Sequence, residues 1–227
     1  MWAISSIAQD TKGIVTIPKE IPQAAQYLKM ASDLVSYGRS TKSALPLIQA
    51  VQIYRQLNVV DEESSADNTT SPFSETTILS DATKYADGNK NLLALIKDIS
   101  NTTRGGLVHP QFGKLGGPFE PPLRFFRTIS PDEIFEHKVR MISEQFIQVV
   151  LDGQGEGIRE KDSKGNILAS DLQLTVFDNK GRILAQDQSK GVNCSVSFLA
   201  RYSSTMTIEV KNNGNLSDNY VLYVYRQ

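Results

Sequence analysis

The sequence predicts an α+β protein in which N-terminal helical hairpins precede a C-terminal antiparallel β-sandwich of jelly-roll-like form. Apolar residues recur every three or four positions up to residue 103, and at every second position after Ile129. A segment rich in glycine and proline, residues 104–122, separates the two patterns. The chain has 227 residues, enough to bury a sizeable core without disulfides or metals.

Composition excludes several classes of function. The 24 basic residues balance 25 acidic ones, so the net charge of −1 provides no broad attraction for nucleic acid. The single cysteine, Cys194, excludes an intramolecular disulfide framework. The two histidines, His109 and His137, exclude a His-rich metal centre. No run reaches the roughly 18 apolar residues of a membrane span, so we expect no transmembrane segment.

Residues 1–9 predict export as a truncated signal peptide. Ser6 and Ala8 occupy the −3 and −1 positions of a signal-peptidase site, and Gln9 would begin the mature chain. A plain disordered N-terminus is the alternative. With export, we expect a periplasmic, cell-surface or secreted protein.

Residues 18–103 predict two related helical hairpins. Pro46 is tolerated only in a first helical turn, so the second helix is expected to begin near Thr41 to Ser43. The motifs Ser32-Asp33 and Leu47-Ile48 return as Ser80-Asp81 and Leu95-Ile96, and Gly88 falls at the break of the second hairpin. The two hairpins form either a partner-binding groove or a plain four-helix packing unit.

Two connecting segments have loop-like compositions. Residues 58–74 form an acidic loop rich in Ser and Thr, and Asp61 to Ser74 within it predict a flexible connection that stays out of the core. Residues 104–122 contain five Gly and four Pro, which predicts a domain linker.

Residues 123–227 predict an antiparallel sandwich or barrel, because turn residues separate their apolar runs at intervals of about ten residues. Alternating apolar positions run through Phe135 to Met141, Leu172 to Phe177 and Tyr220 to Tyr225, so one face of each sheet is expected to be solvent-exposed. Gly165 and Gly181 lie in two similar segments that each predict a hairpin turn.

This half resembles the bacterial pre-peptidase C-terminal domain. The resemblance is carried by Asp171-Leu-Gln-Leu-Thr-Val-Phe-Asp178, by Asn193-Cys-Ser-Val-Ser-Phe198 and by Thr207-Ile-Glu-Val-Lys-Asn212. It implies a secreted jelly-roll sandwich that serves attachment, targeting or binding and is usually non-catalytic. Two departures are Gln173, where the family has a second Asp, and an apparently inserted hairpin at Ile158 to Ser170. A wider likeness extends to exported bacterial proteins that carry a helical region, an Arg-Gly-Gly…Gly-Gly-Pro segment and then this sandwich.

Asp171, Asp178 and Asp187 are the candidate calcium ligands, because they offer hard oxygen atoms near turns. The alternative is that these carboxylates cap their turns, and Gln173 removes one acidic group from the family pattern.

Three tyrosines, Tyr202, Tyr223 and Tyr225, are candidates for a sugar-stacking surface on a solvent-exposed sheet face. Tyrosines in such a place without any ligand are the alternative. Cys194 and His137 fall on apolar faces, where structural roles are expected.

We therefore expect a non-catalytic exported protein for binding or surface attachment, whose partner is an extracellular glycan or protein and which needs no cofactor. One alternative is an accessory or cryptic hydrolase that uses a pair of carboxylates such as Glu156 and Asp171. The other is a structural module stabilised by calcium.

Overall fold

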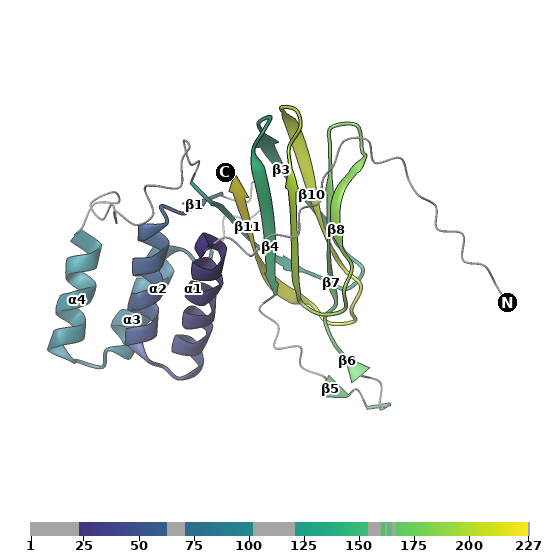
Figure 1. The fold of residues 1–227 in the computed structure, drawn as a ribbon. Coiled ribbons are helices and arrows are strands. Elements are labelled where there is room, and N and C mark those ends of the chain that lie inside the picture. Colours follow the sequence, from purple (N-terminus) through teal and green to yellow (C-terminus); the bar gives the residue numbers. More distant parts are fainter. Residues whose placement is uncertain are drawn as a thin grey trace.

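The computed structural model describes residues 23–62, 71–101, 121–153, 160–161, 163–164 and 167–226. In this part of the chain, a layer of four helices packs against one face of a two-sheet β-sandwich (Figure 1). The predicted α+β class and the order of its two parts are confirmed. The predicted signal peptide and nearly all of the predicted linker lie outside the described residues. None of the described helices is long and apolar enough to cross a membrane.

The first hairpin consists of α1 (Gln23–Ser40) and α2 (Ala44–Gln56). Ser43 is the N-cap of α2, so Pro46 falls in the first turn as predicted. Helix α1 continues through Gly38, and a Cβ atom at this position would lie 2.8 Å from the Leu47 side chain. The glycine therefore permits the two helices to approach closely.

The second hairpin consists of α3 (Glu75–Tyr85) and α4 (Lys90–Asn101). Ser74 caps α3 by accepting a hydrogen bond from the Thr77 amide at 3.2 Å. Gly88 lies in the break with φ of 75°, as its position predicts. Arg39 of α1 donates to Asp81 of α3 at 2.8 Å, and this ion pair links the two hairpins.

The prediction that Asp61 to Ser74 stay out of the core is wrong at Phe73, and the first end of the segment pairs with the sheet. Strand β1 (Val60–Asp61) pairs in parallel with β2 (Leu123–Ile129) of the sandwich. Phe73 is 4% exposed, and its ring centroid lies 5.8 Å from that of Phe126 in β2. Individual apolar residues at the ends of an acidic segment are enough to bind it to the sheet. Residues 63–70 are outside the described part.

The sandwich contains a five-stranded and a four-stranded sheet. The first has the order β1-β2-β11-β4-β9, with β4 at Phe146–Gly153, β9 at Asn193–Leu199 and β11 at Asp218–Arg226. The second has the order β3-β10-β7-β8, with β3 at Ile134–Met141, β7 at Leu172–Phe177, β8 at Ile183–Asp187 and β10 at Ser204–Asn212. Within both sheets, all described pairings except β1 with β2 are antiparallel.

The predicted strands and the expected extra hairpin are present. Strands β5 (Glu160–Lys161) and β6 (Ile167–Leu168) pair with each other outside the two sheets, within the segment that departs from the family pattern. Gly181, with φ of 76°, lies in the turn between β7 and β8 as predicted. Gly165 is outside the described residues.

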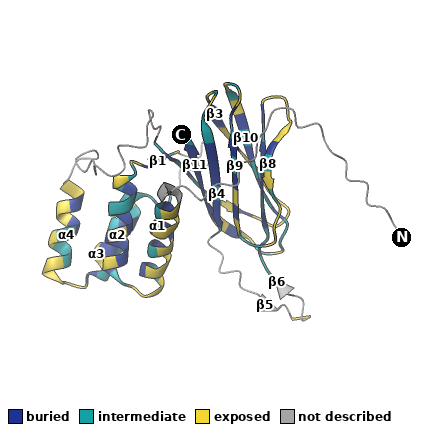
Figure 2. Cartoon of the chain, viewed as in Figure 1, coloured by how far each residue is buried: buried dark blue, intermediate teal, exposed yellow. Residues whose placement is uncertain are grey.

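The helices cover the outer face of the five-stranded sheet. Tyr220, Leu222 and Val224 of β11 belong to the core between the sheets, whereas Val221, Tyr223 and Tyr225 belong to the core of the helical layer. Strand β11 is therefore buried along most of its length (Figure 2). The prediction that one face of each sheet is solvent-exposed is wrong for this sheet. It holds for the other sheet, where β3 presents exposed charged residues.

Candidate functional site

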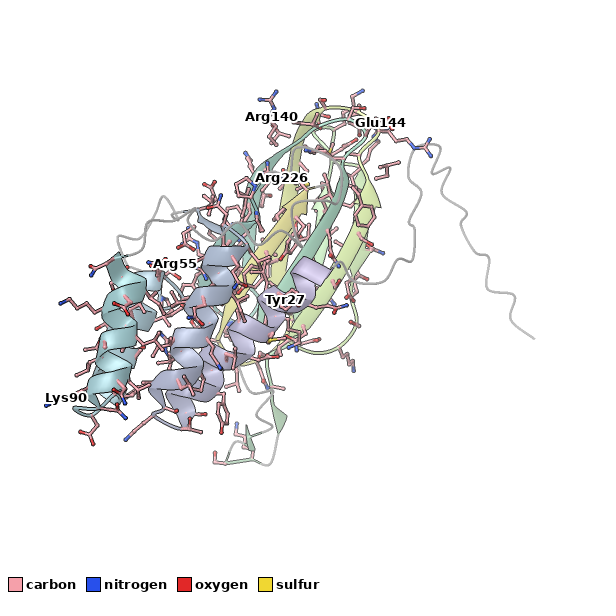
Figure 3. All side chains as sticks on the ribbon, turned by 60° about the vertical axis from the view of Figure 1, so that its left-hand side comes forward. Tyr27, Arg55, Lys90, Arg140, Glu144 and Arg226 are labelled. Carbon is pink, nitrogen blue, oxygen red and sulfur yellow. The ribbon has the colours of Figure 1, made fainter. Side chains whose placement is uncertain are left out.

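A groove of about 410 Å³ lies where α1 meets the five-stranded sheet. Figure 3 shows α1, labelled at Tyr27, beside the sheet strands, with Arg140 and Glu144 at one end of the sandwich. Side chains or backbone from α1, β4, β8 and β9 line the groove: Gln26, Lys29, Met30, Asp33, Val150, Leu151, Asp152, Asp187, Asn193, Cys194 and Ser195. Its volume is within the range of pockets that hold small ligands or side chains of a partner.

The groove exists because the helical layer stops short of β9. Phe126 of β2, Tyr223 of β11 and Val150 of β4 pack against the helical core. On β9, the next strand, Asn193 and Ser195 face the same side and are exposed. The step between the covered strands and the open strand forms the groove.

Carboxylates outnumber ammonium groups in this groove. Among the residues that the structure describes, Asp33, Asp152 and Asp187 line it together with one basic residue, Lys29. The Nζ of Lys29 donates to both carboxylate oxygens of Asp33, at 3.0 and 3.3 Å. Partial burial lowers the pKa of Lys29, but the Asp33 bond and the charge of Asp152 outweigh it and raise the pKa overall. The described residues of the lining therefore carry more negative than positive charge.

An apolar surface adjoins these charges. Met30 on α1 is 47% exposed, and half-buried Val150 lies on the sheet side. The groove thus combines acidic groups with an aliphatic wall.

The position of the helical layer, and with it the groove, depends on a buried contact between α2 and the sheet. The hydroxyls of Tyr54 and Tyr223 are 3.2 Å apart. The Arg124 guanidinium lies 4.3 Å from the centre of the Tyr54 ring, and its Nε donates to Asp61 at 2.6 Å. Burial lowers the pKa of Arg124. The bond to Asp61 and the neighbouring tyrosine hydroxyls raise this pKa by more than burial lowers it, so Arg124 stays charged.

Each of the three predicted calcium ligands holds a local turn or loop. Asp187 accepts hydrogen bonds from the amides of Ser189 at 3.0 Å and Ser195 at 2.9 Å. Burial raises the pKa of Asp187, and the bonds from Ser189 and Ser195 lower it by more. Asp171 accepts a bond from the Gly191 amide at 2.9 Å.

Asp178 is the most heavily bonded of the three. Its carboxylate accepts bonds from the Lys180 and Arg182 amides at 2.8 and 2.9 Å, from Arg182 Nε at 2.7 Å and from the Tyr202 hydroxyl at 2.6 Å. Burial raises the pKa of Asp178, but these bonds together lower it well below its usual value. In the part of the chain that the structure describes, no three His, Cys, Asp or Glu side chains are grouped to hold a metal ion.

The predicted surface of sugar-stacking tyrosines is wrong for two of its members. Tyr223 is 1% exposed and Tyr225 is 6% exposed, because the helices cover their sheet face. Tyr202 lies elsewhere, where its hydroxyl bonds to Asp178 and its ring lies 6.0 Å from the Arg182 guanidinium. The three rings therefore do not form one surface.

Cys194 and His137 have the buried environments that their apolar faces predict. Burial, together with the charges of Asp187 and Asp171, raises the pKa of Cys194 to about 12, and its thiol donates to the Leu172 carbonyl at 3.1 Å. Burial and the charge of Arg127 lower the pKa of His137 to about 3. Glu156 and His109 lie outside the described residues, so the predicted carboxylate pair cannot be located.

The sequence did not predict the groove, although Asp187 and Cys194 of its lining were considered for other roles, because the lining residues come from segments far apart in the chain. One signal was present: Met30 lies off the apolar stripe formed by Leu28, Ala31 and Val35. An apolar residue on the polar face of an amphipathic helix can mark a contact surface.

The fold and groove define an α+β protein made of a β-sandwich and a covering helical layer. No protein-family model and no curated protein matches the chain. A periplasmic inhibitor of g-type lysozyme from Aeromonas hydrophila, PliG, has a similar structure at 11% identity and a TM-score of 0.34, covering 47% of this chain and 86% of that one.

Two further structures are similar at comparable levels. The pre-peptidase C-terminal domain of a Bacillus anthracis collagenase is 12% identical, with a TM-score of 0.26, and covers 45% of this chain and 75% of that one. IMPa from Pseudomonas aeruginosa, solved with an O-glycopeptide, is 10% identical, with a TM-score of 0.29, and covers 92% of this chain and 24% of that one. The resemblance to the pre-peptidase domain is thus a distant likeness in fold, and these scores assign neither family nor function.

Proposed function

We propose that the protein is a non-catalytic binding protein that holds a protein partner in the groove between α1, β4 and β9. The observation that carries this proposal is the groove itself, which places an exposed Met30 and several carboxylates in one concave site of about 410 Å³. Large apolar side chains that stay open beside polar groups are typical of contact surfaces.

The shifted pKa values of Cys194 and His137 support a non-catalytic role for these two side chains. A nucleophilic thiol needs a lowered pKa and a nearby base, whereas the pKa of Cys194 is raised to about 12. A histidine whose pKa is lowered to about 3 is a poor proton carrier near neutral pH, and the His137 ring bonds to Tyr220 inside the core.

The proposal also includes a location outside the cytoplasm. This part of the proposal rests on the signal-peptidase pattern before Gln9. N-terminal sequencing of the protein recovered from the extracytoplasmic fraction of expressing cells should find Gln9 first. Recovery of the full-length chain in the cytoplasmic fraction alone would contradict this part.

A ligand screen with matched variants tests the binding site. The folded chain would be exposed to a displayed library of random peptides and to a printed glycan array, and each ligand found would be measured against Met30→Ser and Leu45→Ser. Met30 and Leu45 are both 47% exposed helical residues, but Leu45 lies outside the groove. Removing the Met30 contact should weaken binding about fivefold, since burying part of such a side chain contributes about 1 kcal/mol.

Leu45→Ser should bind as the unaltered chain does. The groove would be refuted as the binding site if the folded chain bound no ligand in either collection. It would also be refuted if the affinity for every ligand were equally insensitive to both substitutions. A glycan that depends on Met30 would keep the site and replace the protein partner.

A further inference from the structure

We infer that the groove accepts an extended peptide segment of the partner and binds a lysine or arginine side chain of that segment. This inference rests on the proposed function and specifies the chemistry of the partner. Its starting point is the charge of the lining, three carboxylates with one ammonium group.

The ammonium group of Lys29 does not balance all of the carboxylates in the described lining. Lys29 is engaged by Asp33 through both carboxylate oxygens, and Asp152 acts on it as a further negative charge. Asp187 adds another carboxylate from the end of β8. A cationic group entering here meets complementary charge, whereas an anionic ligand is repelled.

The aliphatic wall favours a long basic side chain over a small inorganic cation. Lysine and arginine carry apolar stems that pack along hydrophobic surface while the charged end stays near polar groups. Met30 and Val150 provide such a surface beside the carboxylates. No three metal-ligating side chains are grouped in the described residues, so this lining offers no cage for a divalent ion.

The position of β9 at the edge of its sheet favours a peptide over an isolated amine. Strand β9 is the last strand of its sheet, and the amide of Ser195 points away from β4, because it donates to Asp187 at 2.9 Å. Main-chain groups alternate in direction along a strand, so those of Ser197 and Leu199 also point away from β4, beyond the stretch where Asp187 of β8 occupies the Ser195 amide. A peptide lying along this edge would bond to these groups and could turn a side chain into the groove.

The test uses capped peptides that differ at one position. An N-acetylated, C-amidated peptide of alternating Ser and Thr carries Lys at its centre, and matched peptides carry norleucine or Glu there. Norleucine keeps the apolar stem and removes the charge. Dissociation constants and shifted resonances would be measured by NMR on the ¹⁵N-labelled chain.

We expect the Lys peptide to bind about tenfold more tightly than the norleucine peptide at low salt, and the preference to shrink at high salt. The shifted resonances should map to Met30, Asp33, Asp152 and Asn193. The Glu peptide should bind most weakly.

Two exposed groove residues permit a reciprocal charge test. Lys29 and Asp33 have side chains that are 53% and 61% exposed, so their substitution should leave the fold intact. Lys29→Ala should tighten binding of the Lys peptide about threefold, and Asp33→Asn should weaken it about threefold. Lys90→Ala and Asp98→Asn make the same charge changes on exposed positions of α4, where Figure 3 shows Lys90 away from α1, and should change nothing.

Equal affinities for the Lys and norleucine peptides, preference for Glu, or no shift in the groove with the Lys peptide would overturn the inference. If ligands from the library screen still depended on Met30, the proposed function would survive that result. A glycan that shifts the groove resonances when the Lys peptide does not would likewise overturn the inference alone. Tight Lys-peptide binding with shifts only outside the groove would overturn both.

Discussion

The hydroxyl oxygens of Tyr54 in α2 and Tyr223 in β11 lie 3.2 Å apart, in a buried contact between the helical layer and the sheet. Burial raises the pKa of both hydroxyls, so they remain protonated and one donates to the other. This contact joins two segments far apart in sequence and helps to set the distance between the helices and the sheet. The groove beside α1 depends on that distance.

Tyr223 substitutions should show how strongly the helical layer is held. Tyr223→Phe removes one buried hydrogen bond and should cost about 1 kcal/mol of unfolding free energy. Tyr223→Ala also leaves a cavity and should cost about 3–5 kcal/mol. Urea denaturation would measure both, with Tyr37→Phe as the control because Tyr37 is 59% exposed. A Tyr223→Ala variant as stable as the control would mean that the helices do not pack on this sheet.

The ion pair of Asp61 with Arg124 gives a second prediction. Arg124 is 3% exposed at its side chain and Asp61 is 29% exposed, so Asp61→Asn leaves a largely buried positive charge without its carboxylate. We expect a loss of about 1–3 kcal/mol, less than for a fully buried pair, because water reaches Asp61. Asp33→Asn removes the partner of exposed Lys29 and should cost less than about 0.5 kcal/mol.

Urea denaturation of both variants compares the two ion pairs directly. Equal small losses would show that Arg124 finds other compensation in the folded chain. Loss of β1 pairing in Asp61→Asn, seen as faster amide exchange at Glu62, whose amide bonds to the Arg124 carbonyl at 2.9 Å, would support the predicted mechanism.

Local patterns predicted the elements but not how the two parts of the fold pack together. Pro46, Gly88 and Gly181 each fix a helix start, a break or a turn through backbone geometry that acts over a few residues. Alternation along each strand is likewise a local signal and predicted an antiparallel sandwich or barrel, whereas the jelly-roll form was implied by the resemblance to the pre-peptidase C-terminal domain.

Burial on a second face is not a local property. Val221, Tyr223 and Tyr225 alternate with core residues and fit equally a bare surface or a covered one. The nearly unbroken apolar run from Tyr220 to Tyr225 is typical of a strand covered on both faces, and this signal was outweighed by the alternation of the other strands. The candidate groove was not predictable, because its residues are brought together only when α1 packs beside β4 and β9.

The buried histidine predicts a loss of stability in mild acid. His137 lies in the core with Nε2 2.8 Å from the Tyr220 hydroxyl, between the rings of Phe125 and Phe135. Its folded pKa is lowered to about 3, first by burial and then by the charge of Arg127. In the unfolded chain a histidine titrates near about 6.5.

Below that pH the unfolded chain binds a proton that the folded chain excludes, so the stabilisation is complete above about 6.5 and is lost as pH falls toward 3. We expect about 2 kcal/mol of the unfolding free energy to disappear between about pH 6.5 and 5 through this group. His137→Gln should remove that part of the slope while other titrating groups stay in place. Urea denaturation across this pH range measures it, and equal slopes for both chains would refute the prediction.

Removal of divalent metal should leave stability unchanged. Asp171, Asp178 and Asp187 already accept backbone amide bonds at 2.8 to 3.0 Å, so a calcium ion would have to replace bonds that hold the turns. An ion that binds only the folded chain raises the melting temperature in proportion to the logarithm of its concentration. We therefore expect the same melting temperature, within about 1 °C, with chelator and with excess calcium, since a bound ion at 100 times its dissociation constant would add about 2.7 kcal/mol. Magnesium at equal ionic strength is the control for screening. A rise with calcium that Asp178→Asn abolishes would instead identify these turns as a calcium site.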